Sequence, residues 1–159
     1  SSASAAGPLA DTWNAGSEAE HLNCRIYVWR GGAAGGSVSG ADSYLDVYDI
    51  ATAAWTRTPT LRDSAVMPGF RSGALDTWGV GLGADAAHER LFVLGGEGNR
   101  RLYVFDPAAK AWAAGPDAPY DGGWGSSVEH VASVGLHLID GRNATGAPQG
   151  TAVLSPRRR

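Results

Sequence analysis

Short apolar, β-prone runs recur along the chain between polar segments, and three of them are followed by a glycine pair or an Asp-Gly pair. These three runs occupy residues 26–29, 91–94 and 136–139. Two further alternating runs, at 45–49 and 102–106, each end in an aromatic residue followed by Asp. Alternation over about four to eight residues is typical of a half-buried β-strand. The pattern therefore predicts a succession of short strands separated by tight turns.

The spacing between these features is the same in two copies. Trp55 lies six residues after Asp49, and Trp112 lies six residues after Asp106. A further Trp stands ahead of each of three units, at positions 13, 78 and 124. Each unit thus holds four candidate strands: one near the leading Trp, one ending at glycine, one ending at aromatic-Asp and one containing the second Trp. Repetition at this period indicates a repeat architecture.

Four short antiparallel strands per repeat are typical of a β-propeller blade. Gly79 and Gly81 alternate with Val80 and Leu82, which suits an inner strand where neighbouring sheets approach closely. We expect a linker at 1–10, repeat units at 11–60, 61–117 and 118–154, and a basic tail at 155–159. Because a propeller closes with roughly four to eight blades, the predicted fold class is an all-β propeller of four-stranded antiparallel blades, incomplete in this chain.

The repeated residues resemble the kelch motif of the galactose-oxidase and kelch-like propellers. They are Gly31, Gly32, Tyr48, Asp49 and Trp55 in the first unit and Gly95, Gly96, Phe105, Asp106 and Trp112 in the second. The resemblance covers most of residues 11–154 and is weaker in the third unit, where Asp140-Gly141 replaces the glycine pair. It implies a non-catalytic protein-protein interaction scaffold within a larger protein or assembly. The alternative is a propeller-borne enzyme or secreted glycan-binding protein whose active residues lie outside this chain.

Composition narrows the range of functions. A net charge of −3 and a pI near 5.7 give no electrostatic argument for nucleic acid, and no apolar run approaches the roughly 20 residues that span a bilayer. No Gly-x-Ser-x-Gly elbow is present. The histidines at 21, 88 and 130 are expected to be turn residues, because a metal needs three or four side chains converging at about 2 Å. We therefore expect no metal and no cofactor.

Two residues bear on the cellular compartment. Cys24 is the single cysteine, so no intrachain disulfide can form, and we expect a buried thiol in a cytoplasmic protein. Asn143-Ala144-Thr145 fits the N-glycosylation pattern. A glycan at Asn143 would instead indicate a secreted or extracellular protein.

The strand meander predicts two faces of loops, and the longer loops gather on one of them. The predicted partner-binding residues of that face are Arg30, Arg62, Phe70, Arg71, Arg100, Arg101, Tyr120 and Arg142. Arg and Tyr are enriched in interface hot spots, and guanidinium groups hold carboxylates bidentately. We expect this face to bind a protein partner with an acidic segment, besides further blades from the same or another chain. In the alternative, these arginines pair with acids of the same loops. The opposite face is expected to be acidic, with Asp49, Asp85 and Asp106 in its turns.

Overall fold

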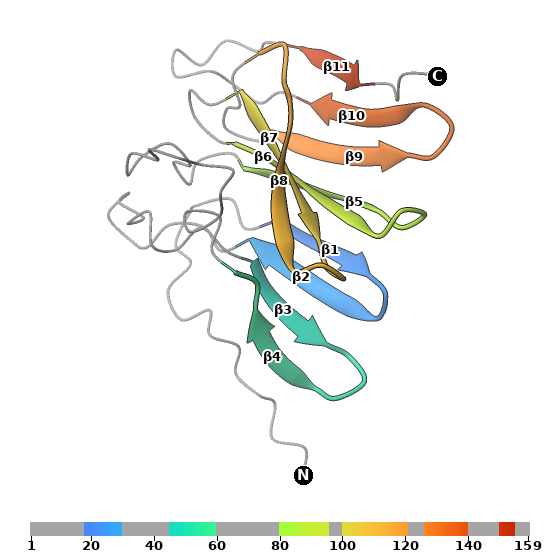
Figure 1. Cartoon of the computed structure of the whole chain (residues 1–159). Helices are drawn as coiled ribbons and strands as arrows, with labels where there is room; N and C mark the ends of the chain where they lie inside the picture. The colour runs from blue at the N-terminus through green and yellow to red at the C-terminus, as the bar shows by residue number, and fades with distance from the viewer. Residues whose placement is uncertain are drawn as a thin grey trace.

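The computed structural model describes residues 18–29, 45–59, 80–95, 100–120, 126–139 and 150–154 (Figure 1). This part of the chain forms eleven strands and no helix, and every pair of neighbouring strands is antiparallel. The strands make three separate sheets of three or four strands each. The predicted all-β class is therefore confirmed.

Each sheet is a simple meander. The first contains β1 (Glu18–Leu22), β2 (Arg25–Trp29), β3 (Leu45–Asp49) and β4 (Ala54–Arg57), in that order. The second contains β5 (Gly81–Asp85), β6 (Arg90–Leu94), β7 (Arg101–Asp106) and β8 (Ala111–Asp117). The third contains β9 (Ser127–Val131), β10 (Gly135–Ile139) and β11 (Thr151–Leu154). Each sheet begins a few residues beyond one of the leading tryptophans, and those tryptophans lie outside the described residues.

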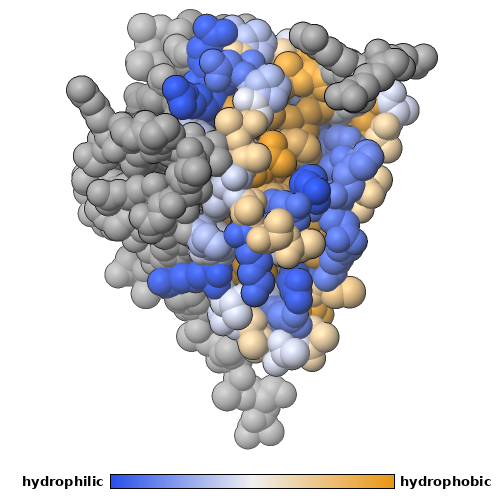
Figure 2. Space-filling view, viewed as in Figure 1, coloured by the Kyte–Doolittle hydropathy of each residue, from blue (hydrophilic) through white to orange (hydrophobic). Residues whose placement is uncertain are grey.

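The second sheet lies between the other two and is apolar on both faces. Along β6, Leu91 and Val93 pack into a core shared with the first sheet, which includes Leu22, Tyr27 and Trp29. Phe92 and Leu94 point the opposite way and pack with Val128, Leu136 and Leu138 of the third sheet. The side-chain alternation of a strand thus supplies two cores from one sheet. Figure 2 shows apolar surface in the upper half of the view, where the third sheet lies, and a more polar mixture below.

The first strand of the second sheet, β5, packs against the first strands of both neighbours, β1 and β9. Its two glycines allow this approach to β9. A Cβ atom at Gly83 would lie 2.6 Å from the carbonyl oxygen of Val128, and one at Gly81 would lie 2.9 Å from a methyl group of the same residue. Both distances are shorter than real Cβ contacts. The prediction of small residues where sheets crowd together is confirmed at Gly81, whereas Gly79 lies outside the described residues.

Three four-residue turns share one construction, and each starts at an aspartate. The carboxylate oxygen accepts hydrogen bonds from backbone N–H groups two or three residues on: Thr52 for Asp49, Ala87 and His88 for Asp85, and Ala108 and Ala109 for Asp106. The last turn residue has a left-handed φ in every case: Ala53 (52°), Glu89 (53°) and Lys110 (52°). Such Asp-to-backbone bonds specify the turn locally, so these aspartates fix where each hairpin reverses.

The turn between β1 and β2 is tighter and corrects one expectation. Only Asn23 and Cys24 separate the strands, and their φ angles are 51° and 58°. Two positive φ angles define a type I′ hairpin turn, which favours Asn in the first position and Gly in the second. Cys24 is exposed at this turn. The expectation of a buried thiol was wrong because the residue before the apolar run belongs to the reversal and not to the strand.

Candidate functional site

Of the predicted partner-binding residues, only Arg100, Arg101 and Tyr120 fall in the described part of the chain. The others, Arg30, Arg62, Phe70, Arg71 and Arg142, lie outside it, as do Gly31, Gly32, Gly96 and the glycosylation candidate Asn143. Arg100 is anchored to the end of β8 through its own backbone and side chain. Its Nε donates to the Ala118 carbonyl at 2.9 Å, and its carbonyl accepts from the Ala118 N–H at 2.7 Å.

Arg101 and Tyr120 have different surroundings. Arg101 is exposed at the start of β7, opposite Asp117 of β8. Tyr120 is half-buried, packs against the core between the second and third sheets, and donates its hydroxyl hydrogen to the Leu138 carbonyl. It therefore joins two sheets, a structural role that the sequence did not indicate. The partner-binding role of this loop face stays a prediction.

The repeated aromatic residues form the same contact in two sheets. The Tyr48 and Trp55 rings lie 5.0 Å apart at an interplanar angle of 46°, and the Phe105 and Trp112 rings lie 4.9 Å apart at 47°. Such tilted pairs are a favourable arrangement of aromatic rings. Trp112 also donates its indole N–H to the Pro59 carbonyl at 2.8 Å, which links the second sheet to the first. Phe105 and Trp112 thus pack between two sheets, whereas Tyr48 and Trp55 contact each other within one sheet.

The two pairs differ in burial. Phe105 and Trp112 are 3% and 6% exposed because the first sheet covers them. Tyr48 and Trp55 are only half-buried, and no described sheet covers their face of the first sheet. Asp46 lies on the same side of β3 as Tyr48 and is fully buried. One of its oxygens accepts from Arg57 Nε at 3.0 Å, while the other lacks a hydrogen-bond partner among the described residues.

The acidic turn face is less acidic than its residue count indicates. Arg25 Nε lies 3.1 Å from Asp49 Oδ2, and Arg90 lies 3.0 Å from Asp106 Oδ2. The pKa of Asp49 is lowered chiefly by the hydrogen bond from the Thr52 backbone and then by Arg25. The pKa of Asp106 is lowered chiefly by the Ala109 N–H, with the Arg90 charge adding to it. Both carboxylates thus accept hydrogen bonds from their turns and form an ion pair with an arginine of the adjacent strand.

A third aspartate connects two sheets and two histidines. Asp85 Oδ2 lies 2.6 Å from Nδ1 of His88, in its own turn, and 3.4 Å from Nε2 of His130, in β9 of the third sheet. The His130 ring stacks on Phe92 with centroids 6.4 Å apart. Burial raises the pKa of Asp85, but hydrogen bonds from His88 and the charges of both histidines outweigh burial, so the pKa lies below its usual value.

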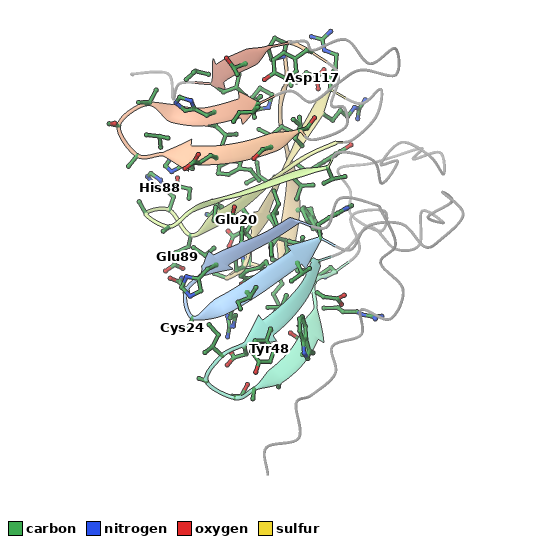
Figure 3. All side chains as sticks on the ribbon, turned by 180° about the vertical axis from the view of Figure 1, so that it is seen from behind. Glu20, Cys24, Tyr48, His88, Glu89 and Asp117 are labelled. Atoms are coloured by element: carbon green, nitrogen blue, oxygen red, sulfur yellow. The ribbon has the colours of Figure 1, made fainter. Side chains whose placement is uncertain are left out.

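This cluster is the feature that sequence reasoning missed. His88 does lie in a turn as expected, exposed at the end of the β5–β6 hairpin (Figure 3). The expectation was wrong for His21 and His130, because they lie in strands β1 and β9, and His130 also contacts the neighbouring sheet. The only sequence signal of His130 was its position, which matches that of His21 in the first unit. Within the described strands and turns, no group of three or more His, Cys, Asp or Glu side chains is arranged to hold a metal ion.

Comparison with known proteins adds no relative. No protein-family model matches the chain, and no curated protein is significantly similar to it. Among the described residues, none belongs to a helix long and apolar enough to cross a membrane.

Proposed function

We propose that this chain is a segment of a kelch-type β-propeller that serves as a non-catalytic scaffold for protein-protein interaction. The support is the equivalence of its first two sheets. Both carry the same strand order, the same Asp-initiated turn and the same tilted aromatic pair. Repeats of this kind stack their sheets and present loops on a rigid frame, where binding residues are commonly found.

One observation carries the proposal: within the described part of the chain, no sheet covers the aromatic pair of the first sheet. In the second sheet, the equivalent pair is buried by a neighbouring sheet, and Trp112 donates to the Pro59 carbonyl of that neighbour. By repeat equivalence, the face bearing Tyr48 and Trp55 is suited to receive another sheet of the same kind. The scaffold thus includes at least one interface beyond the described sheets.

Light scattering coupled to size exclusion tests this interface on the isolated chain. Over rising concentration, we expect the wild-type mass to exceed that of one chain as second copies cover the aromatic face. Trp55→Ser removes the ring and shifts the mass toward one chain. Ile50→Ser is the matched control, because it removes a 47% exposed apolar side chain from the neighbouring turn. A wild-type chain that stays monomeric at all concentrations and melts cooperatively would contradict the proposal.

The loop face is the proposed site for an acidic partner segment, with Arg100 and Arg101 as its described members. Charge reversal at both positions is expected to weaken capture of natural partners from the source extract and to reduce the salt sensitivity of capture, since exposed charge pairs are screened by salt. Unchanged capture would count against this face and would leave the sheet-stacking interface to be judged by light scattering.

A further inference from the structure

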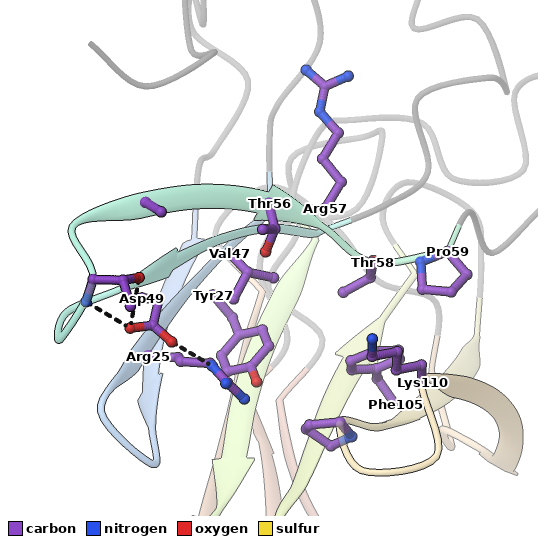
Figure 4. A pocket seen from close by; sticks show the side chains of 13 residues that line it. Arg25, Tyr27, Val47, Asp49, Thr56, Arg57, Thr58, Pro59, Phe105 and Lys110 are labelled. Carbon is purple, nitrogen blue, oxygen red and sulfur yellow. Dashed lines mark hydrogen bonds and ion pairs between the residues drawn. The ribbon is translucent and has the colours of Figure 1, made fainter. Parts of the chain in front are cut away.

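Two junctions of the same kind join the three described sheets. At the first junction, Tyr27 and Val47 of the first sheet pack in one core with Phe105 of the second sheet. The two sheets leave a pocket of about 320 Å³ between them, which these residues line together with Lys110 (Figure 4). At the second junction, the opposite face of the second sheet packs against β9 and β10. The second sheet therefore meets the sheet before it with one face and the sheet after it with the other.

The third sheet has an outer face, which is the face turned away from the second sheet. Val128 and Leu138 pack toward the second sheet, and side chains alternate along a strand. The outer face therefore carries the alternate residues, and one row of them crosses β9, β10 and β11 in register: Glu129, His137 and Val153. Val153 is 46% exposed, and Ile139 on the same face is 44% exposed. Two large apolar side chains thus lie at this surface.

This row occupies the same place as the row that the first sheet presents to the second. Each member is the third residue of its strand, as are the members of the first-sheet row: Glu20, Tyr27 and Val47. The second sheet meets that row with a row that crosses β5 to β8 in register: Ala84, Leu91, Phe105 and Trp112. The outer face of the third sheet is thus the counterpart of a surface that already joins two sheets.

The first sheet carries the counterpart of the second-sheet row on its own outer face. This row crosses β1 to β4 in register and consists of His21, Ile26, Tyr48 and Trp55. Its aromatic members form the same tilted pair as Phe105 and Trp112. The chain therefore carries both halves of a third junction, on the two sheets that flank the second sheet.

We propose that the outer face of the third sheet packs against the outer face of the first sheet in a second copy of this chain. Val153 then contacts the rings of Tyr48 and Trp55, as Val47 packs with Phe105 within one chain. Two copies contribute six described sheets, and closed propellers contain roughly four to eight blades. A head-to-tail contact of this kind closes into a ring when both ends of each copy engage. The pairing rests on the proposed function, because it uses the proposed stacking of sheets, and it identifies the surface that covers the aromatic face.

The polar ends of the two rows also match. Glu129 and His21 are both exposed, and they lie opposite each other in the proposed junction. A carboxylate and an imidazole can share a hydrogen bond, and Asp85 Oδ2 already lies 3.4 Å from His130 Nε2 across the second junction. Glu20, at the place equivalent to Glu129, is half-buried on the face that meets the second sheet, so a glutamate at this place is compatible with stacked sheets. A second copy is favoured as the occupant because this chain itself carries the matching row.

Mixing of two variants tests the head-to-tail contact, with the mass measured by light scattering coupled to size exclusion. Val153→Lys places a charge on the outer face of the third sheet, and Trp55→Ser removes a ring from that of the first. Each variant alone is expected to associate about ten-fold more weakly than wild type or worse, since burial of one Val side chain amounts to about that factor. An equimolar mixture contains one intact junction per pair of chains and should regain the mass of two chains. Ile50→Lys, at a 47% exposed turn residue, is the matched control and should associate as wild type does.

The outcomes separate this junction from sheet stacking in general. If Val153→Lys alone keeps the wild-type mass while Trp55→Ser does not, the aromatic face has a different occupant and the role of the third sheet is overturned. A mixture that stays at the mass of one chain also overturns it. A wild-type chain that stays monomeric at all concentrations would contradict both this junction and the proposed stacking.

The single cysteine allows the orientation of the two copies to be measured independently. Cys24 is exposed in the β1–β2 turn, and Figure 1 shows this turn on the same side of the sheets as the β9–β10 turn. A nitroxide on Cys24 of an unlabelled copy should broaden the amide signals of Ala132 and Ser133 in an isotopically labelled Cys24→Ser copy. Val153→Lys in the labelled copy should abolish this broadening. Broadening confined to Asn23 and its neighbours would indicate contact between two aromatic faces and would overturn the head-to-tail pairing.

Discussion

At the scale of single residues, much of the architecture depends on side chains that are absent or short. Gly83 faces the β9 backbone so closely that any side chain must displace it. Asp49, Asp85 and Asp106 fix three turns through bonds to nearby N–H groups. The sequence predicted the three aspartate turns and the small residue at Gly81, but not the close contact at Gly83, because aspartate before a turn acts over only a few residues whereas the contact at Gly83 depends on how β9 docks. It could not predict where His130 points, because that depends on how two sheets dock.

Substitution of Gly83 tests the docking of β5 on β9. Gly83→Ala places a Cβ 2.6 Å from the Val128 carbonyl oxygen, so the sheets must separate or the strand must shift. We expect a loss of roughly 2–3 kcal/mol in the free energy of unfolding, as for overpacking of a core. Ala113→Val is the control, because it enlarges an exposed residue of β8. Denaturant unfolding measures both, and equal stability of the two variants would show that the sheets are not in close contact.

The Asp85 cluster predicts a pH dependence of stability. Its folded pKa lies below the usual value, so its contribution is present at neutral pH and is lost as pH falls through about 4 and then through the lower folded pKa. Asp85→Asn should therefore lose about 1–2 kcal/mol at pH 7, and its difference from wild type should shrink as pH falls below about 4 and continue to shrink through the lower folded pKa. Glu89→Gln, in the same turn, controls for a general charge effect. A difference that stays constant from pH 7 to pH 3 would assign the loss to packing alone.

At the scale of elements, the sequence predicted strands and turns better than contacts between sheets. The glycine-terminated apolar runs became β2, β6 and β10, the two alternating runs became β3 and β7, and the second Trp of the first two units lies in β4 or β8. A strand was predicted around each leading tryptophan. The first strand of each sheet begins a few residues after that tryptophan in the described part of the chain. The Trp112 bond to Pro59 and the Tyr120 bond to Leu138 join separate sheets. No local pattern encodes such bonds, because each depends on the relative placement of segments far apart in the chain.

For the candidate sites too, the sequence predicted local features but not those formed by segments far apart in the chain. Repeat spacing identified the aromatic residues, and their rings contact each other in both the first and the second sheet. The pocket beside Lys110 had no sequence signal, since its walls come from β2, β3, β4 and the turn after β7. The turn face is also less acidic in the structure than the sequence predicted. Arg25 and Arg90 lie on the strands next to Asp49 and Asp106 and form ion pairs with them. Charge counted along the chain is a poor guide to charge at a surface.

At the scale of the whole molecule, the inner strands of the second sheet supply buried side chains to the cores on both sides of the sheet. Its two apolar faces belong to two different cores, so losing it would expose both at once. The three sheets should therefore unfold in a single cooperative step, although repeat units in other arrangements can open one by one.

Hydrogen exchange gives this consequence a measurable form. Amides of β6 and β7, the central strands of the second sheet, should exchange only by global unfolding and so be the slowest in the chain. Amides of β4 and β11, at the outer edges of the other sheets, should exchange through local opening. Equal protection of all three sheets is compatible with the cooperative step, whereas slower exchange in the first or third sheet would contradict it. In that case the second sheet would not be the most stable part of the chain, and the other two sheets would not depend on it for their stability.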